Sequence, residues 1–461
     1  MLAAFYQRSI INIASKVCSL LSTEYLSPAH IQLLQTIRFK RLLKHVLKNS
    51  QFYRQHYRPH GITLDTIGDI SLQDLPPIDK QMMMDHYDDF VCDPFLKRKN
   101  LENFLTVSQD PKEKYRNIYT VMHTSGSSGV ISLYVYGPND WAWAKALVVT
   151  RVVKPRSHLP RRTRLAFIGT TDGHYAAVST SSDAPSFLVD FLSLPINTPL
   201  ERINAKIDAF QPDVLCGYSS GIYLLSQEQL RGKIAVRPER IISTSEPLTS
   251  EVNETVKRAF GRAPLNLYAA TESPCLAAQC DLHQDLHMEA DWHIFEALDD
   301  QFRAVPAGIP GRLFLTNLYN YTQPLIRYRM NDEIVKSGHP CQCGSPLPTI
   351  SNLAGRQEDF LWYNAAEGKR DFVHPSVLHE IFVIGLKRFQ YIQLPRNELL
   401  MKVIIDGNKE TVLPAIRQRM TEILRGKDLD KTVKLHIEVV RDIPNDPVTG
   451  KYKTVIPLKD F

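Results

Sequence analysis

The chain has 461 residues, of which 43% are hydrophobic and 23% charged, a composition typical of a globular protein. No run of about 18 uncharged apolar residues is present, so we expect no membrane span. The net charge of +6 is explained first by solvated helix faces, and attraction to an anionic nucleotide, a cofactor or an acidic partner protein is the alternative. No basic motif interleaved with aromatic residues is present, so we do not expect nucleic acid to be a partner.

The N-terminal stretch "MLAAFYQRSIINIASKVCSLL" is mildly apolar, but Arg8 and Lys16 interrupt it. It lacks the ordered basic, apolar and cleavage regions of a signal peptide, so we expect an amphipathic helix. The chain has seven cysteines. An odd number without a signal peptide argues against a disulfide framework and predicts a cytoplasmic location.

Apolar residues recur at helical spacing through the first hundred residues, as in "HIQLLQTIRFKRLLKHVL". From about residue 120 to 350, short apolar or β-branched runs alternate with helix-like segments. Alternation of this kind predicts a parallel α/β sheet. We expect strands at 164–169, 213–218, 240–246, 264–270 and 311–318, with helices at 220–230 and 249–260.

The pattern changes near "NLAGRQEDFLWYN". The last hundred residues mix helical and strand patterns, which is enough for a small α+β domain with its own core. We therefore predict a large N-terminal α/β domain with mixed or parallel sheets over residues 1–354, and a small, mobile α+β domain over residues 355–461.

The stretch "TSGSSG" (residues 124–129) separates two apolar runs. Glycine lets the backbone approach a ligand and adopt positive φ, while serine and threonine add hydroxyl donors to exposed N–H groups. The loop could therefore hold a phosphate chain, although turns and linkers share this composition. No Gly-Lys-Ser/Thr follows, so it is not a Walker loop.

Four further stretches offer groups that suit a nucleotide site. "NLYAATES" carries Thr271 and Glu272 directly before its last residue, and a carboxylate at a strand end is a suitable Mg²⁺ ligand. "PLIRYRMND" ends in Asp332, which could accept hydrogen bonds from a ribose diol. "GRQED" contains Arg356, and "DPVTGKYK" presents Lys451 beside a glycine.

Taken in order, these stretches resemble the adenylate-forming superfamily of acyl-CoA synthetases, and most of all its phenylacetate–CoA ligase branch. The resemblance covers about residue 40 to the C-terminus. It implies that the nucleotide phosphates are held by Thr124, Ser125, Gly126, Ser127, Ser128 and Gly129. The adenine would lie beside Ser245, Glu246, Pro247 and Tyr268. The ribose would be held by Asp332 and Arg356. It further implies catalytic roles for Thr271 at the α-phosphate, Glu272 at Mg²⁺ and Lys451, with Glu358 as the hinge between the domains.

The implied activity is ATP-dependent activation of a small carboxylic acid as an acyl-adenylate, followed by transfer to CoA as a thioester. The acceptor stays open between CoA, an acidic carrier protein and an amine, and assembly as a homodimer is also left open. A zinc-bearing interaction or sensor protein on a degenerate ligase scaffold is the non-enzyme alternative. One departure concerns the phosphate loop, because Val130 and Ile131 follow it where the family usually has Lys-Pro.

Cys341 and Cys343, in "HPCQCGS", are spaced to supply half of a tetrahedral Zn²⁺ site. Cys280 and one histidine would complete it, and spacing alone favours His283. The family resemblance selects His287 instead, and we adopt His287. We expect a structural zinc with no open coordination position.

The resemblance also places four aromatic residues at the acyl pocket, namely Tyr136, His174, Tyr175 and Tyr218. Aromatic residues suit a flat aryl acid, although ordinary core packing would explain them almost as well. We predict an aromatic acid as the substrate, with an aliphatic or amino acid as the alternative.

Overall fold

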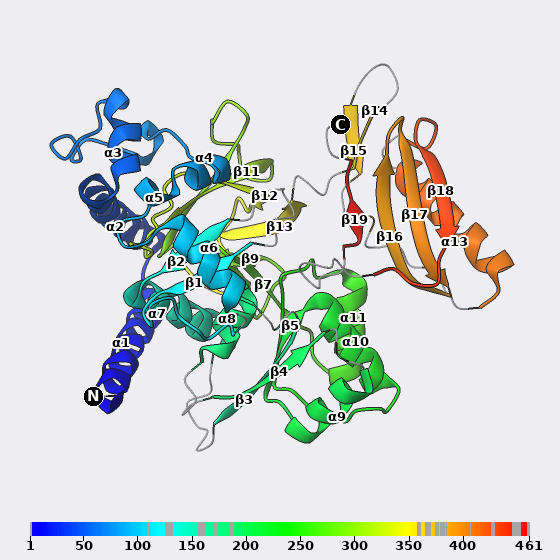
Figure 1. Ribbon diagram of the computed structural model, residues 1–461. Coiled ribbons are helices and arrows are strands. Elements are labelled where there is room, and N and C mark those ends of the chain that lie inside the picture. Colours follow the sequence, from blue (N-terminus) through cyan, green and yellow to red (C-terminus); the bar gives the residue numbers. More distant parts are fainter. Residues whose placement is uncertain are drawn as a thin grey trace.

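The structure of the protein is a computed structural model (Figure 1). It describes residues 2–458 except for residues 109, 125–131, 155–161, 170, 172, 185–188, 197, 199, 357–360, 365–369, 374–377, 379–382, 384, 406, 426–428 and 445–452.

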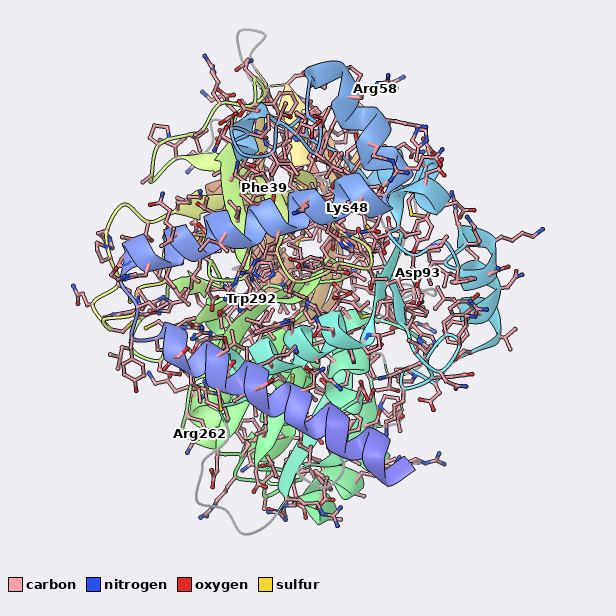
Figure 2. The ribbon with its side chains drawn as sticks, turned by 90° about the vertical axis from the view of Figure 1, so that its left-hand side faces the viewer. Phe39, Lys48, Arg58, Asp93, Arg262 and Trp292 are labelled. Atoms are coloured by element: carbon pink, nitrogen blue, oxygen red, sulfur yellow. The ribbon has the colours of Figure 1, made fainter. Side chains whose placement is uncertain are left out.

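Two long helices, α1 (Leu2–Thr23) and α2 (Pro28–Asn49), open the chain. Helix α2 begins where the side chain of Ser27 accepts a hydrogen bond from the backbone of His30, with proline at the first helical position. Figure 2 shows α1 and α2 crossing the same face of the molecule, with Trp292 between them. Four shorter helices follow, α3 (Gln51–Tyr57), α4 (Lys80–Asp85), α5 (Tyr87–Phe90) and α6 (Arg98–Val107).

An eleven-stranded mixed sheet forms the centre, in the order β10-β11-β12-β13-β9-β8-β7-β6-β5-β3-β4. Strands β7, β6, β5, β3 and β4 are mutually parallel, and helices cross between them. Their bounds are β3 (Thr163–Gly169), β4 (Val189–Pro195), β5 (Val214–Tyr218), β6 (Arg240–Thr244) and β7 (Leu265–Ala270), with α8 (Ala176–Ser182), α9 (Leu200–Phe210), α10 (Ser219–Leu230) and α11 (Ser250–Phe260).

The other half of the sheet is antiparallel. Its strands are β8 (Ser273–Gln279), β9 (Leu286–Met288), β10 (His293–Leu298), β11 (Pro310–Asn317), β12 (Tyr328–Lys336) and β13 (Thr349–Arg356). A separate antiparallel pair, β1 (Thr120–His123) and β2 (Leu133–Tyr136), leads into α7 (Pro138–Leu147) and a π-helix (Val148–Val153).

The C-terminal elements form a smaller lobe (Figure 1). A four-stranded sheet in the order β18-β17-β16-β19 packs with one long helix. Its hydrophobic core is separate from that of the large sheet. The elements are β14 (Leu361–Asn364), β15 (Arg370–Val373), β16 (Leu386–Leu394), β17 (Glu398–Ile405), α13 (Lys409–Arg425), β18 (Lys434–Val439) and β19 (Val455–Ile456).

The expected strands at 164–169, 213–218, 240–246, 264–270 and 311–318 correspond to β3, β5, β6, β7 and β11, and both expected crossover helices form. The edge strand β4 was not predicted, because its side chains are mostly half-buried and give no clear periodicity. Residues 357–360, at the predicted domain boundary, lie outside the described residues. Within the described part of the chain, none of the helices combines the length and apolar character of a membrane span.

The separate core of the C-terminal lobe can be tested by a cavity-forming change. Ile416 on α13 is fully buried in this core, so Ile416→Ala should lower the free energy of unfolding of this lobe by about 2–5 kcal/mol. The matched control Gln418→Ala, on the exposed side of the same helix, should change it by less than about 0.5 kcal/mol. Denaturant unfolding in which both variants match the wild type would contradict the packing described.

Candidate functional site

Three predicted site segments meet at one edge of the large sheet. Strands β5, β6 and β7 run parallel and adjacent, so their carboxyl ends lie together. Tyr218 ends β5, Ser245 follows β6, and Thr271 follows β7. Ligands of open α/β sheets bind outside the carboxyl ends of the strands, which makes this edge the candidate site.

Thr271 and Glu272 form the two-residue turn between β7 and β8, where Ala270 pairs with Ser273. The amide of Asn317 donates a hydrogen bond of 3.0 Å to the backbone carbonyl of Glu272. The turn is therefore fixed both by the hairpin and by Asn317 at the end of β11.

Tyrosine hydroxyls orient the Glu272 carboxylate. Tyr134 on β2 donates to Oε1 at 2.7 Å, and its hydroxyl lies 2.8 Å from that of Tyr328. Burial raises the pKa of Glu272, and the hydrogen bond from Tyr134 and the charge of Lys80 partly oppose this rise. A carboxylate with buried partners and a perturbed pKa, at a strand end, is a candidate functional group.

The predicted adenine and ribose residues also lie together. The hydroxyl of Tyr268 on β7 donates to Oδ2 of Asp332 on β12 at 2.6 Å. Asp332 is paired in the sheet with Arg356 of β13. The hydrogen bond between Tyr268 and Asp332 joins two segments that are 64 residues apart in the chain.

A small pocket of about 50 Å³ connects these groups. The residues that line it are Lys80, Thr124, Ala270, Thr271, Glu272, Tyr328, Arg329, Met330, Asn331 and Asp332. It therefore brings together the start of the predicted phosphate loop, the predicted Mg²⁺ ligand and the predicted ribose acceptor.

Lys80 is a site residue that was not predicted from the sequence. It occupies the first position of α4, where the side chain of Asp79 caps the helix. It lines the pocket from a segment almost two hundred residues before Glu272. The one available signal was the absence of a lysine after the phosphate loop, which leaves an anion site short of a cation.

The segment after β6 is held by the start of α10. The carboxylate of Glu246 accepts a hydrogen bond of 2.9 Å from the backbone of Ser220, and Ser219 donates to the carbonyl of Glu246 at 3.1 Å. Ser245 has a φ of 69°, a left-handed conformation uncommon outside glycine. Glu246 therefore caps the helix, and the position of Ser245 to Pro247 beside adenine stays a prediction.

The four predicted acyl-pocket residues are divided by their contacts. Tyr136 donates to the carbonyl of Thr271 at 2.9 Å and so touches the site segment directly. His174 is buried and bonded to Ser108 at 2.9 Å, and Tyr175 lies against His123 with ring centroids 4.6 Å apart. His123 ends β1, the strand leading to the phosphate loop. Tyr218 is buried at the end of β5.

Some of the predicted site residues belong to parts of the chain that the structure does not describe. Residues Ser125, Gly126, Ser127, Ser128, Gly129, Glu358 and Lys451 lie outside the described residues. Arg356 is described only in its backbone.

A second group of predicted residues converges at β9. The ligand atoms of Cys280, His287, Cys341 and Cys343 all lie within 4.8 Å of one another. Cys343 Sγ is 3.3 Å from His287 Nε2, and the sulfurs of Cys341 and Cys280 are 3.8 Å apart.

These distances suit one metal ion. A tetrahedral Zn²⁺ with Zn–S bonds of about 2.3 Å holds its sulfurs about 3.8 Å apart. The carbonyl of Leu347 lies 3.3 Å from His287 Nδ1, on the ring side away from the thiols, and such contacts orient metal-binding histidines. His283, which spacing alone favoured, is exposed and outside this group.

Comparison with known proteins places the chain in context. No family model matches it. It is 21% identical over 434 residues to "Protein CapK" of Staphylococcus aureus, covering 90% of this chain and 86% of the relative. It is 26% identical over 377 residues to the phenylacetate-coenzyme A ligase of Escherichia coli K12, covering 78% of each.

Among solved structures, 2-hydroxyisobutyryl-CoA ligase in its postadenylation state superposes with a TM-score of 0.74. The identity is 18%, over 95% of this chain and 92% of the other. The predicted fold class and the predicted resemblance to the adenylate-forming ligases are confirmed.

The cysteine–histidine group predicts a measurable metal content. Purified protein should carry about one Zn²⁺ per chain, and Cys343→Ser or His287→Ala should remove most of it. Because a metal bound only by the folded state stabilises it, chelation should lower the melting temperature by several degrees. Elemental analysis with thermal unfolding measures both.

Two matched variants serve as controls for the zinc assignment. Cys18→Ser removes an exposed cysteine of α1, and His283→Ala removes the neighbouring histidine; both should keep their zinc. Wild-type protein without zinc and indifferent to chelation would refute the metal site, and zinc loss in His283→Ala alone would refute the choice of histidine.

Proposed function

We propose that this chain is a ligase that activates a carboxylic acid with ATP. The carboxylate oxygen attacks the α-phosphorus, the bond to pyrophosphate breaks, and an acyl-adenylate forms. The observation that carries the proposal is the pocket in which Lys80, Thr271, Glu272 and Asp332 meet at the strand ends. An ammonium, a hydroxyl and two carboxylates are the groups that phosphates, a divalent cation and a ribose require.

The electrostatics of the pocket suit this reaction, because two anions must approach each other. Lys80 would offset the charge of the pyrophosphate that leaves. It would replace the lysine that the family usually has after the phosphate loop. Glu272 has the donor chemistry for Mg²⁺, which is commonly held by one or two carboxylates plus substrate phosphates. When bound, that ion would neutralise charge on the phosphates.

Tyr268 and Asp332 would hold the nucleoside. Their hydrogen bond of 2.6 Å fixes the carboxylate beside an aromatic ring, so one side chain can accept from the ribose while the other stacks on the base. The resemblance adds Lys451 as a second cation that reaches the site from the C-terminal domain. That domain, residues 355–461, would pivot at Glu358 between the two half-reactions.

In the second half-reaction, the thiol sulfur of CoA would attack the acyl carbonyl and release AMP. Support comes from the phenylacetate-coenzyme A ligase of E. coli and from 2-hydroxyisobutyryl-CoA ligase, whose names give CoA as the acceptor. An aromatic acid is the proposed substrate, and Tyr136, which touches Thr271, is the proposed contact. The Cys280–His287–Cys341–Cys343 group would hold a structural zinc.

The activity can be tested by carboxylate-dependent exchange between ATP and pyrophosphate over a panel of aryl and aliphatic acids. Exchange should be strongest with an aromatic acid. Glu272→Gln and Lys80→Ala should each lower the exchange rate by about a hundredfold or more, because Lys80 would offset the charge of the phosphates and Glu272 would hold the cation that does the same. Lys451→Ala should do the same.

The matched control is Glu254→Gln on the exposed surface of α11, which should exchange like wild type. Exchange unchanged in all three site variants would refute the residue assignments, and no exchange with any acid would refute the activity. Consumption of CoA thiol then distinguishes a thioester product from an amide or a carrier-bound one.

Removing the Tyr134 hydroxyl should shift the pH dependence of kcat/KM for MgATP. Its hydrogen bond lowers the pKa of Glu272 against the effect of burial, so Tyr134→Phe should raise that pKa further. Because only the ionised carboxylate binds a divalent cation, the acidic limb of kcat/KM for MgATP should move to higher pH. Initial rates across the pH range measure this.

Tyr223→Phe is the control for this shift. Tyr223 on α10 also donates a hydrogen bond to a glutamate, Glu251 on α11, at 2.7 Å. Its profile should match wild type. A Tyr134→Phe profile that stays in place, or moves to lower pH, would show that Glu272 does not act in its ionised form.

A further inference from the structure

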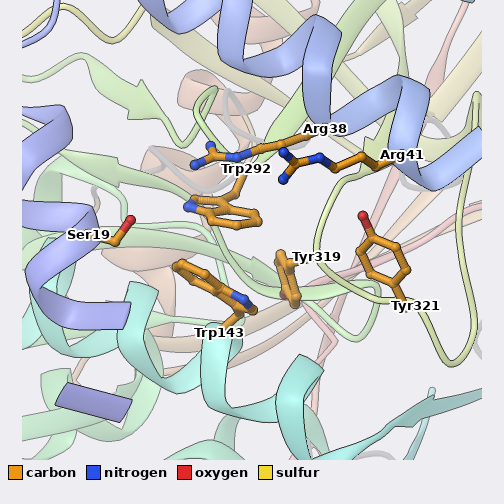
Figure 3. Close-up of a pocket in the computed structure, with 7 residues that line it drawn as sticks. All are labelled: Ser19, Arg38, Arg41, Trp143, Trp292, Tyr319 and Tyr321. Carbon is orange, nitrogen blue, oxygen red and sulfur yellow. The ribbon is translucent and has the colours of Figure 1, made fainter. Parts of the chain in front are cut away.

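A larger cavity, lined by residues other than those of the candidate nucleotide site, lies beneath α1 and α2. It has a volume of about 330 Å³ and shares no lining residue with the smaller pocket. Figure 3 shows its walls, two arginines from α2, two tryptophans, two tyrosines and Ser19 of α1. No step of the proposed reaction uses these residues.

Four of the seven residues that line the cavity are tryptophan or tyrosine. The rings of Trp143 and Trp292 lie against each other with centroids 3.7 Å apart, and Tyr319 and Tyr321 face them across the space (Figure 3). Trp143 and Arg38 already lie against the Trp292 ring, so a planar ligand would meet the indoles by edge contacts, which aromatic rings favour. The volume is in the range of small-molecule sites.

The charge of the cavity is positive. Arg38 and Arg41 are three residues apart on α2 and line the same side of it. Arg38 lies over Trp292 at 3.6 Å and donates to the carbonyl of Asp291. Neither guanidinium forms an ion pair with a carboxylate of the described residues, and each presents a planar fork suited to a carboxylate or phosphate.

Asp291, which precedes Trp292, and Asp140 both accept hydrogen bonds from groups other than the two arginines. Asp291 is bonded to Arg151 at 3.1 Å and to Thr23 at 3.0 Å. Asp140 accepts from the hydroxyl of Thr322 at 2.6 Å. Arg38, half-buried, and Arg41, exposed, therefore line the cavity without an ion pair to either carboxylate.

A buried donor adds an independent indication. Trp292 is 8% exposed, and its indole Nε1 has no hydrogen-bond partner among the described residues. Figure 3 places this nitrogen on the ring edge that faces Ser19. Buried donors are nearly always satisfied, so an unsatisfied one on a cavity wall indicates a group that binds there.

We propose that this cavity is a second ligand site, which binds a small planar aromatic anion. The ring would lie among Trp143, Trp292 and Tyr319, the anionic group would meet Arg38 and Arg41, and the indole of Trp292 would supply a further donor. The hydroxyl of Tyr319 lies 2.8 Å from that of Ser273, the residue after Glu272. A ligand in the cavity would thus contact a residue bonded to the segment that carries the candidate Mg²⁺ ligand.

The test is calorimetric titration of the full chain, without nucleotide, against four probes. Phenylacetate and phenylphosphonate carry the ring and an anion, phenethyl alcohol lacks the charge, and cyclohexylacetate lacks the aromatic ring. We expect both aromatic anions to bind, the stronger of the two identifying the anionic group, and the other two probes to bind at least about tenfold more weakly.

Two variants locate the site. Arg41→Ala should weaken binding of phenylphosphonate by about tenfold, because it removes a charge-assisted contact. Lys44→Ala removes a charge from the exposed side of the same helix and should bind like wild type. Trp143→Phe should also weaken binding and reduce the ligand-induced change in tryptophan fluorescence.

Any of three outcomes would overturn the proposal. These are no binding of either aromatic anion, equal binding of the uncharged probe, and Arg41→Ala binding as Lys44→Ala does. Arg41 lines the larger cavity and not the smaller pocket, so a loss of binding in Arg41→Ala reports on this cavity whether or not the chain proves to be a ligase.

Discussion

The contact on which the candidate site depends is the hydrogen bond between Tyr134 and Glu272. It joins β2, which follows the predicted phosphate loop, to the turn between β7 and β8. Without it, the Glu272 carboxylate would be a partly buried charge with one less donor, and burial favours its neutral form. The Tyr134 hydroxyl on β2 therefore partly offsets the rise in the pKa of this carboxylate that burial causes.

The surrounding fold makes this contact possible. Parallel strands bring Tyr218, Ser245 and Thr271 to one edge, and the antiparallel half of the sheet then returns β12 so that Asp332 reaches Tyr268. The same half of the sheet carries β9, whose His287 joins three cysteines. A metal there would fix the segment between β12 and β13 to the centre of the sheet, away from the reacting groups.

Much of this arrangement could be predicted from the sequence, and the exceptions have physical reasons. Thr249 marks the start of helix α11 in the sequence, and its side chain caps the helix, so this start was predicted correctly. Strand β4 lies at the sheet edge with half-buried side chains, so its pattern of apolar and polar residues was too weak to predict a strand. Lys80 meets Glu272 only through tertiary packing, and no local pattern marks it. The choice between His283 and His287 depended on family resemblance, because both spacings satisfy the chemistry of zinc.

In the proposed reaction the pocket joins a carboxylate to the α-phosphorus of ATP. This step can be followed with phenylacetate labelled with ¹⁸O in the carboxyl group, incubated with ATP, Mg²⁺ and CoA, with mass analysis of the nucleotide product. Attack by the carboxylate leaves one labelled oxygen in AMP when the thiol displaces it. Labelled AMP should form in step with the thioester. Formation of ADP, or of AMP without label, would show that the carboxylate does not attack the α-phosphorus.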